Sequence, residues 1–378
     1  MKKLFAVLMA VLMVFALVGC GSNEAPATDD TAAGDETLKT VYIMGPTPDH
    51  GWTAQAGTYA DQKAKEITEA GQYKGVYMAA SSGEEQVDQC NQIVANGDAA
   101  IVVMMPLEDS AAAGQEALYA AGIPFISFDR IIESTEKYAA LNTSGDNWAV
   151  GAGIAYWLQQ NGLKPGDTVV VLYGDNGTVC SRRQEGFEQF LQGTRKYEDQ
   201  NLGTFETAET WTPEQTAAVF TGYQVVCDWS ADKAVDYLDQ KITEIIDAAT
   251  ANGGNLYIYS MDDEMTFGVL TTLETKVTGT DYEAKAEALN IYCSAIGGMQ
   301  ELFDVMSGKD ANKSAISEKY FDDIMDMYFS PKMMKDVIDK GLDYCNGNWN
   351  YKTGDGYYTP VFMVDKALAA TTEGFTGH

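Results

Sequence analysis

Charged, amide and aromatic side chains gather directly after several short apolar runs of this sequence. They are Asp49, His50 and Trp52; Asp129 and Arg130; Asn142, Asp146 and Asn147; Arg182 and Arg183; Trp229; and Asp262 and Asp263. Carboxylates and guanidinium groups make strong hydrogen bonds to hydroxyl edges, and indole rings pack against apolar ring faces. A single such residue after a strand is usually a helix cap. So many at equivalent places instead predict a site for a small hydroxylated ligand of sugar type.

The same residues give little support for catalysis. Histidine occurs only at position 50 and at the C-terminus, and no HExxH, GxSxG or Walker motif is present. Gly151–Gly153 begins like a dinucleotide fingerprint, but Tyr156 takes the place of the third glycine. Asp262 and Asp263 could act as an acid–base pair, yet neighbours on one turn rarely face the same ligand. We therefore expect a binding protein and not an enzyme.

Strand-like and helix-like segments alternate from residue 39 onward. The strand-like runs are Thr40–Met44, Lys74–Ala79, Ala99–Met104, Pro124–Phe128, Ala139–Leu141, Thr168–Tyr173, Gly222–Cys227, Asn255–Ser260 and Asn290–Ser294. The helix-like stretches are Thr53–Ala70, Glu84–Asn96, Ser110–Ala121, Trp148–Asn161, Ser181–Gln192, Ala231–Ala251, Glu264–Thr275 and Met299–Gly308. This alternation predicts an α/β fold with parallel sheets covered on both faces. Ligands bind beyond the carboxyl ends of such strands, where the polar residues stand.

The N-terminus has the features of a secretion signal. Lys2 and Lys3 precede an apolar run from Leu4 to Val18, which is short for a membrane span. The run ends in Leu17-Val18-Gly19-Cys20, which resembles a lipobox; an ordinary signal with a chance cysteine is the alternative. We expect a signal peptide at 1–19, a lipidated Cys20 and a disordered tether at 20–37, which has no large apolar side chain. The mature protein would be lipid-anchored and extracytoplasmic.

The composition is strongly acidic, with 25 Lys and Arg against 55 Asp and Glu, a net charge of −30. The electrostatic field of so negative a chain repels phosphate backbones, so nucleic acid is not an expected partner.

Five cysteines remain beyond Cys20: Cys90, Cys180, Cys227, Cys293 and Cys345. They form no CxxC pair, which leaves one disulfide or buried thiols open. No calcium-binding loop is present, and we expect neither a metal nor a cofactor.

At these residues the chain resembles the type I periplasmic sugar-binding protein family. The resemblance rests on AGIPFISFDR (Ala121–Arg130), TSGDNWAVG (Thr143–Gly151), RQEGF (Arg183–Phe187), DEM followed by Gly268 (Asp263–Met265) and VFMVDK (Val361–Lys366). The extended FDRIIE and a long insertion before Trp229 are similar to the branch that binds D-xylose and multiple sugars. These motifs occur in the family's order between Val41 and Asp365.

The resemblance implies a role for each candidate residue. Trp52 and Trp229 would cover opposite faces of a sugar ring. Asp129 would accept hydrogen bonds from two hydroxyls, while Arg130 and Arg183 would donate. Asp262 stands where the family often has asparagine. The further contacts implied are His50, Asn147 and Tyr328.

Two departures from the family stand at the far side of the implied site. Ile296 takes the place of a common aspartate, and Met327-Tyr328-Phe329 aligns with a region where the xylose branch has a lysine. Losing both partners of a buried ion pair leaves no uncompensated charge. The sequence therefore predicts a less polar rim there.

The resemblance further implies two Rossmann-like lobes joined by a three-strand hinge. Lobe one would comprise 38–143 and 328–360, and lobe two 144–327 and 361–378. Such a protein would be a monomer that binds a monosaccharide or related small polyol between the lobes and delivers it to an ABC permease. A nucleoside-binding or furanone-binding lipoprotein of the same fold is the alternative.

Overall fold

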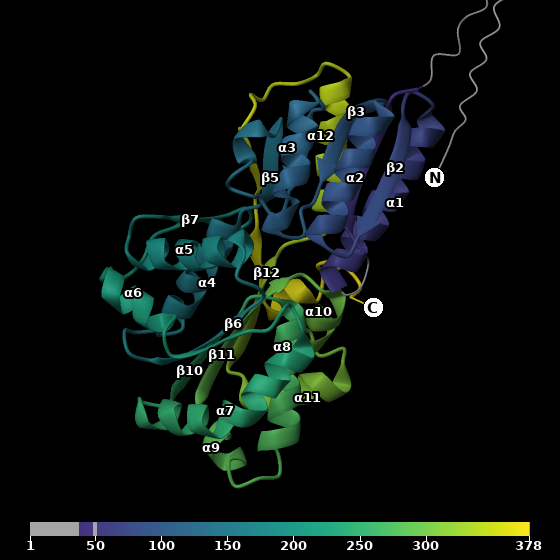
Figure 1. Ribbon diagram of the computed structural model, residues 1–378. Helices are drawn as coiled ribbons and strands as arrows, with labels where there is room; N and C mark the ends of the chain where they lie inside the picture. Colours follow the sequence, from purple (N-terminus) through teal and green to yellow (C-terminus); the bar gives the residue numbers. More distant parts are fainter. Residues whose placement is uncertain (1–37, 48–50, 378) are drawn as a thin grey trace, which may run out of the picture. The chain divides into compact units, whose positions relative to one another are not determined.

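Two six-stranded sheets carry the fold of the residues that the computed structural model describes, 38–47 and 51–377 (Figure 1). The first sheet has the order β13 (Gly356–Thr359), β5 (Leu141–Gly145), β4 (Phe125–Phe128), β3 (Ala99–Met104), β1 (Thr40–Pro46), β2 (Lys74–Ala80). The second has the order β14 (Phe362–Val364), β12 (Asp323–Tyr328), β11 (Asn290–Gly297), β10 (Asn255–Ser260), β6 (Thr168–Tyr173), β9 (Tyr223–Val226). All neighbours are parallel except the edge strand β14, which runs antiparallel to β12. The predicted α/β fold with two parallel sheets is confirmed.

Helices connect most of the strands. The longer ones are α1 (Gly51–Ala70), α2 (Gly83–Asn96), α3 (Ala112–Ala120), α4 (Asn147–Gln160), α5 (Thr178–Leu191), α7 (Ala231–Ala251), α8 (Asp263–Thr272), α11 (Ala311–Tyr320) and α12 (Met333–Cys345). The shorter helices are α6 (Pro213–Val219), α9 (Glu283–Glu287), α10 (Gln300–Met306) and α13 (Lys366–Ala369), with single turns at Asp109–Ala111, Glu136–Tyr138 and Leu273–Val277. A small hairpin, β7 (Tyr197–Asp199) and β8 (Gly203–Phe205), completes the set.

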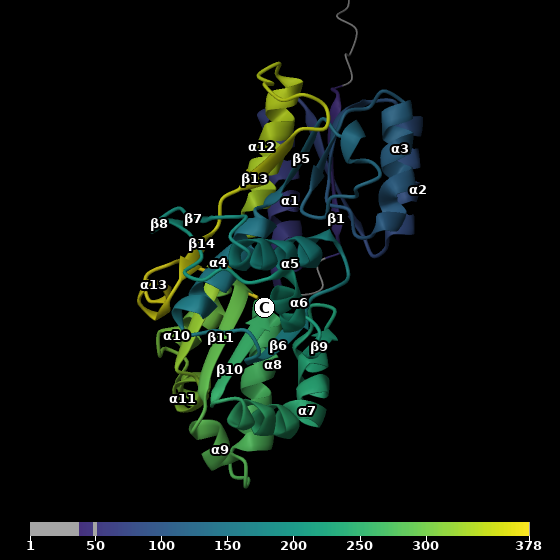
Figure 2. The same ribbon diagram turned by 90° about the vertical axis from the view of Figure 1, so that its left-hand side faces the viewer.

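The first sheet is buried on both faces because alternate side chains of its strands point to different helices. Val41 and Ile43 of β1 belong to the cluster that includes apolar residues of α1 and α12. Tyr42 and Met44 belong to the other cluster, with residues of α2 and α3. Period-two alternation with apolar residues on both faces is the pattern of a covered parallel sheet. Figures 1 and 2 show these helices around the sheet.

The second sheet repeats this design. Helix α4 contacts β11, β12 and β14 and packs against α5, whereas α7 and α8 contact β10. Close backbone approach brings α4 and α5 together: a Cβ at Gly151 would lie 1.8 Å from the carbonyl oxygen of Arg183. The Gly151–Gly153 segment thus serves helix packing, as the missing third glycine indicated.

Three crossovers connect the two sheets, as expected for a three-strand hinge. The chain passes from β5 to α4, from β12 to α12, and from β13 to β14. Each crossover leaves the carboxyl end of a strand. The residues that follow strands of both sheets can therefore meet in the region between them.

The observed elements differ from the predicted ones where polar residues interrupt a strand. The predicted strand 139–141 lies instead at Leu141–Gly145, because the turn-forming Thr143, Ser144 and Gly145 are fully buried and pair with β13. Strands β12 and β13 were not predicted; in β12, Asp326 interrupts the apolar run. The helical stretch predicted to begin at Ser110 starts with a single turn, and α3 itself begins at Ala112.

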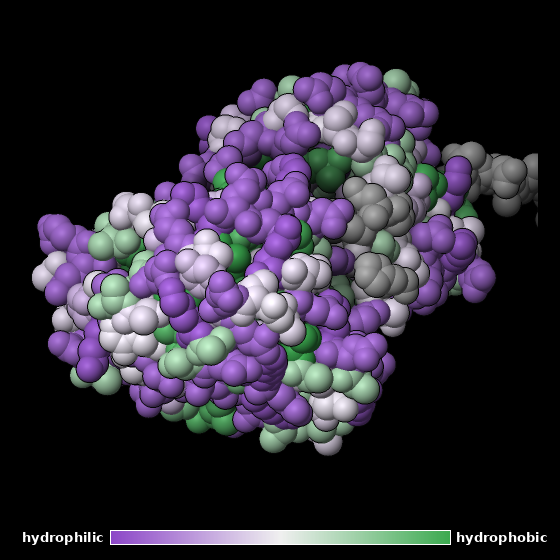
Figure 3. Space-filling model, turned by 90° about the horizontal axis from the view of Figure 1, so that it is seen from below, coloured by the Kyte–Doolittle hydropathy of each residue, from purple (hydrophilic) through white to green (hydrophobic). Residues whose placement is uncertain are grey.

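The cysteines of the described residues form no disulfide. Cys90, Cys180, Cys227 and Cys293 are buried free thiols, and Cys345 is half-buried. Large exposed hydrophobic residues in this part of the chain are limited to Leu38, Tyr119 and Leu202. Figure 3 shows hydrophilic residues over most of the face seen from below. Few acidic side chains of the described residues lie in the core: the buried ones are Asp129, Asp199, Asp263 and Asp326.

Candidate ligand-binding cavity

A cavity of about 600 Å³, counting its mouth, lies at the carboxyl ends of the strands of both sheets. The first sheet contributes Trp52, Thr53, Met105, Asp129 and Arg130, and the second contributes Val179, Arg183, Trp229, Asp262, Asp263, Glu264, Ile296, Gly297, Met299, Phe329 and, from the C-terminal tail, Phe375. Positions far apart in the sequence thus converge on one space.

Asp129 is the buried carboxylate on the first sheet's side. It follows β4, its backbone N–H donates to Thr143 O at 2.8 Å, and its side chain is 7% exposed. No described residue gives its carboxylate a hydrogen bond. Burial raises the pKa of Asp129, although the positive charges of Arg130 and Arg183 oppose the shift. A carboxylate left in this state is an acceptor that a ligand could satisfy.

Arg130 links the two sides of the cavity. Its Nη1 donates to Leu107 O at 2.6 Å, and its Nη2 lies 3.6 Å from Asp175 Oδ2. Trp229 Nε1 donates to the same Asp175 oxygen at 3.1 Å. Asp175 therefore orients one arginine and one indole from different sheets. Sequence reasoning missed it, although it follows β6 as the other candidates follow their strands.

Trp52 stands at the start of α1 with its indole directed toward the second sheet. Its Nε1 donates to Phe329 O at 2.7 Å. Its ring stacks on Phe128, with centroids 6.3 Å apart, and is tilted against Phe329 at 6.0 Å. The indole is thus fixed by packing and by one hydrogen bond, which presents its remaining surface to the cavity.

Arg183 is the buried cation on the second sheet's side and is 3% exposed. Its Nε donates to Asn147 Oδ1 at 2.9 Å and its Nη1 to Met261 O at 2.5 Å. The guanidinium also lies over the rings of Trp229, at 5.7 Å, and Phe329, at 5.1 Å. These contacts on several sides hold its position without an ion pair, in the manner of cation–π packing.

Strained backbone is concentrated at this site. Among described residues other than glycine, positive φ angles occur at Asp129 (65°), Asp228 (47°) and Trp229 (59°). Such conformations cost about 1–3 kcal/mol each and persist where the surrounding structure enforces them, often at functional sites. Here they set the direction of the Asp129 carboxylate and the Trp229 indole.

Three carboxyl groups lie close together on the second sheet's side of the cavity. Asp262 caps α8 by accepting Glu264 N–H at 2.9 Å. Asp263 Oδ2 accepts Met299 N–H at 2.7 Å, while its buried Oδ1 has no partner. Asp326 of β12, fully buried, accepts from Gly297 N at 3.1 Å and Gly298 N at 3.0 Å.

Burial makes the charged form of these carboxyls costly. Burial raises the pKa of Asp263 to about 7, although backbone donors oppose the shift. Burial also raises the pKa of Asp262 and of Asp326 well above the usual range, and the neighbouring Asp263 charge raises both further. The cavity is thus poised to receive groups that donate hydrogen bonds or carry positive charge.

The structure places the predicted site residues in three groups. Trp52, Asp129, Arg130, Arg183, Trp229 and Asp262 line the cavity. Asn147 lies behind Arg183 and holds it. Tyr328 is directed elsewhere: its hydroxyl donates to Glu373 O at 3.2 Å, and its ring stacks on Phe362. His50 and Cys20 lie outside the described residues.

Several lining residues were not predicted. Asp263 was set aside because neighbours on one turn seldom face one ligand, yet Asp262 and Asp263 both line the cavity. Phe329, one position beyond Tyr328, takes the place expected for that tyrosine. Ile296 lines the cavity, as the departure from the family indicated. No sequence signal identified Phe375.

Within 38–47 and 51–377, no helix has the length and apolar character needed to span a bilayer. His, Cys, Asp and Glu side chains of that part of the chain also form no group able to hold a metal ion.

Solved structures share this fold along most of the chain. An arabinose ABC transporter binding protein from Shewanella sp. ANA-3, bound to L-arabinofuranose, has TM-score 0.62 and 16% identity, and the match covers 88% of this chain and 93% of that one. A Bacillus halodurans ABC transporter solute-binding protein with bound myo-inositol has TM-score 0.62 and 13% identity, with 89% and 98% covered. A Chloroflexus aurantiacus carbohydrate transporter solute-binding protein in complex with D-glucose has TM-score 0.60 and 18% identity, with 86% and 92% covered.

Sequence comparison identifies the family directly. No curated protein sequence matches the chain significantly. The profile of the periplasmic binding protein domain, however, matches residues 41–289, more than half of the sequence. The chain therefore belongs to the periplasmic binding protein domain family, whose members bind solutes and do not catalyse reactions.

Proposed function

We propose that this chain is the solute-binding component of an ABC importer and captures a monosaccharide or a related small polyol in the cavity between its sheets. One observation carries the proposal: the buried Asp129 carboxylate, without a hydrogen-bond partner, shares a cavity with Arg183 and two indoles. This combination suits a ring with apolar faces and hydroxyl edges. The solved relatives with bound L-arabinofuranose, myo-inositol and D-glucose support the ligand class.

Ligand capture couples to closure of two lobes, comprising 38–143 with 328–360 and 144–327 with 361–378. The ligand contacts Trp52, Asp129 and Arg130 on one side and Arg183 and Trp229 on the other. Only a closed form makes both sets of contacts, so binding shifts the population toward it. The permease then recognises the closed surface.

Membrane attachment is the second part of this proposal. Cys20 carries a lipid after removal of residues 1–19, and the chain acts outside the cytoplasm at the end of a tether. Fractionation of cells expressing the full chain tests this. The native chain is expected with the membranes and the Cys20→Ala chain in the soluble fraction; equal distribution of both would refute the lipid anchor.

A thermal-shift panel tests the ligand class. Tight binding of a ligand to the folded state raises the melting temperature by mass action. Pentoses, hexoses, inositols and glycerol are compared with adenosine, because the apolar lining at Ile296, Phe329 and Phe375 also suits a nucleobase. Stabilisation by adenosine alone would favour the nucleoside-binding alternative.

Asp129→Ala measures the contribution of the central acceptor. Loss of a buried, charge-assisted acceptor is expected to weaken binding of the best panel ligand by about 2–4 kcal/mol. Asp88→Ala, which removes an exposed carboxylate from α2, is the matched control and should bind as the native chain does. Unchanged affinity in Asp129→Ala would remove Asp129 from the site.

A further inference from the structure

The segment 373–377 pairs with backbone that lines the cavity. Phe375 N–H donates to Gly298 O at 3.0 Å, and Gln300 N–H donates to Phe375 O at 2.7 Å. These two hydrogen bonds belong to a parallel bridge between Met299 and Phe375. Both residues of the bridge line the cavity. A part of the chain that is remote in sequence from the strand ends thus supplies a wall of the site.

Contacts on both sides of Phe375 hold this segment in place. Gly374 N–H donates to Gln300 Oε1 at 3.0 Å, and Gly377 N–H donates to Glu301 Oε1 at 3.1 Å. The backbones also approach closely, because a Cβ at Gly374 would lie 2.6 Å from Gln300 N. A side chain at position 374 would therefore push the segment away from the cavity wall.

The backbone that receives the segment is itself fixed from the core. The N–H groups of Gly297 and Gly298 donate to the buried Asp326, at 3.1 and 3.0 Å. Met299 N–H donates to Asp263 at 2.7 Å. Residues 297–300 are thus held by carboxylates on one side and by the paired segment on the other. A site residue supported in this way keeps its position when a ligand enters.

The ring of Phe375 adds an apolar surface to the cavity. Phe375 is 4% exposed and lines the cavity beside Ile296 and Met299, which are 1% and 2% exposed. The C–H face of a sugar ring packs on such a surface, whereas its hydroxyl groups gain no hydrogen bond there. Truncation of a buried phenylalanine leaves a void. At this position the void would be continuous with the ligand cavity.

We infer that Phe375 is a specificity-determining residue, which closes the cavity beside Met299 and restricts the ligand to a single ring without a bulky substituent on that side. The inference rests on the proposed function and narrows its ligand class to unsubstituted monosaccharides and small polyols. Larger glycosides are excluded because the docked segment 373–377 occupies the space that their second group needs.

Calorimetry on the full chain tests the inference with matched ligands. The tightest-binding sugar or polyol of the thermal-shift panel is compared with its mono-O-methyl and mono-O-benzyl ethers, one for each hydroxyl group. Phe375→Ala is expected to bind the parent compound about tenfold more weakly than the native chain does, because the apolar contact is lost. The same variant is expected to bind at least one benzyl ether about tenfold more tightly than the native chain does, because the added ring fills the void.

Two further variants separate specificity from stability. Phe321→Ala removes an equally buried phenylalanine, 4% exposed, which follows α11 and does not line the cavity. This control should lower the melting temperature but bind the parent compound as the native chain does and gain no benzyl ether. Gly374→Val keeps the Phe375 ring but prevents close docking of its segment. It should weaken binding of the parent compound as much as Phe375→Ala does.

The outcomes separate this inference from the proposed function. If the native chain binds a sugar or polyol and Phe375→Ala shows the same affinities for the parent compound and its ethers, the inference is overturned and the sugar-binding proposal stands. Weaker binding of the parent compound without a gain for any benzyl ether assigns Phe375 a merely structural role and also overturns the inference. Failure of the native chain to bind any sugar or polyol overturns both.

Discussion

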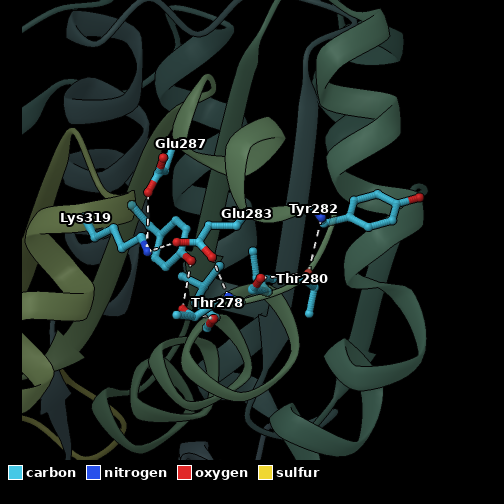
Figure 4. Close-up of polar contacts among 10 residues, drawn as sticks. Thr278, Thr280, Tyr282, Glu283, Glu287 and Lys319 are labelled. Atoms are coloured by element: carbon cyan, nitrogen blue, oxygen red, sulfur yellow. Dashed lines mark hydrogen bonds and ion pairs between the residues drawn. The ribbon is translucent and has the colours of Figure 1, made fainter.

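Near the second sheet, Glu283 and Glu287 of α9 reach Lys319 of α11 (Figure 4). In the cavity, by contrast, Asp263 accepts its hydrogen bond from the backbone N–H of Met299. The hydrogen bond to Lys319 lowers the pKa of Glu283, while burial raises that of Asp263 to about 7. The same functional group is thus satisfied by a lysine in one region and left with an unpaired oxygen in the other.

This difference indicates how an acidic protein keeps a few of its carboxyls for a ligand. Exposed carboxyls reach lysines on flexible side chains, and water stabilises whatever remains. In the cavity, Arg183 is tied to Asn147 and Met261 O, so it stabilises the carboxyls by its charge without neutralising any of them. The fold thus keeps Asp129 and Asp263 in the cavity without a salt bridge to any described residue.

Removal of Arg183 should produce the largest effect on stability. Arg183→Met leaves Asn147 Oδ1 and Met261 O without their donor and takes a positive charge from among buried carboxyls. We expect the free energy of unfolding, measured by urea titration, to fall by about 3–5 kcal/mol. Arg195→Met, which removes a half-buried arginine held by Gln189, is the control. If Arg183→Met lowered the free energy of unfolding no more than Arg195→Met does, the cavity would not differ from the surface in the way described.

A change of pH should alter the stability of the ligand-free chain less than the loss of Arg183 does. The pKa of Asp263 rises from its ordinary 3.8 to about 7 in the folded chain. The folded state therefore binds the proton of Asp263 more tightly than the unfolded state does. The contribution of this proton to the free energy of unfolding is complete below about pH 4 and is lost as the pH rises through about 7. The melting temperature of the ligand-free chain should thus be higher at pH 5.5 than at pH 8.

Two variants assign this pH dependence to the cavity. Asp263→Asn should reduce the difference between the two pH values, since the variant has no carboxyl to titrate. Glu283→Gln should leave it unchanged, because the lowered pKa of Glu283 lies below the whole interval. A melting temperature that does not change between pH 5.5 and pH 8 would contradict the raised pKa of Asp263.

Loss of Lys319 should have the smallest effect. Lys319→Met removes the partner of Glu283 and Glu287, but both carboxyls are partly exposed and can turn to water, so such pairs near the surface contribute little. We expect a melting temperature close to that of the native chain and unchanged affinity for the best ligand in the thermal-shift panel. Destabilisation comparable with that of Arg183→Met would show that the two regions do not differ as described.

Much of the fold followed from local pattern. Runs such as Thr168–Tyr173 and Asn255–Ser260 are strands with the predicted bounds because they are short, apolar and flanked by helices. The strands that were missed or shifted contain polar residues that tertiary contacts satisfy. Asp326 interrupts the apolar run of β12, yet its carboxylate is fully buried against two backbone N–H groups.

The sequence predicted which strand ends contribute to the candidate site. It predicted less well which residue at each strand end faces the cavity. Asp129 and Trp229 each follow a strand, Arg183 lies within α5, and all three line the cavity. Tyr328 and Phe329 are neighbours in the sequence, but only Phe329 faces the cavity. Successive side chains of a strand point in opposite directions, so an error of one position changes the side on which a residue lies.

The sequence by itself determined the alternation of strands and helices, the family, and the gathering of polar residues after strands. Only the tertiary structure decided that the cavity's arginines and indoles donate to the protein while Asp129 and Asp263 keep unpaired oxygens. The physical reason is that local pattern follows from neighbouring residues, whereas the partners of Arg130 and Arg183 come from distant segments that only the folded chain brings together. Which hydrogen bonds remain for a ligand is therefore a property of the folded chain.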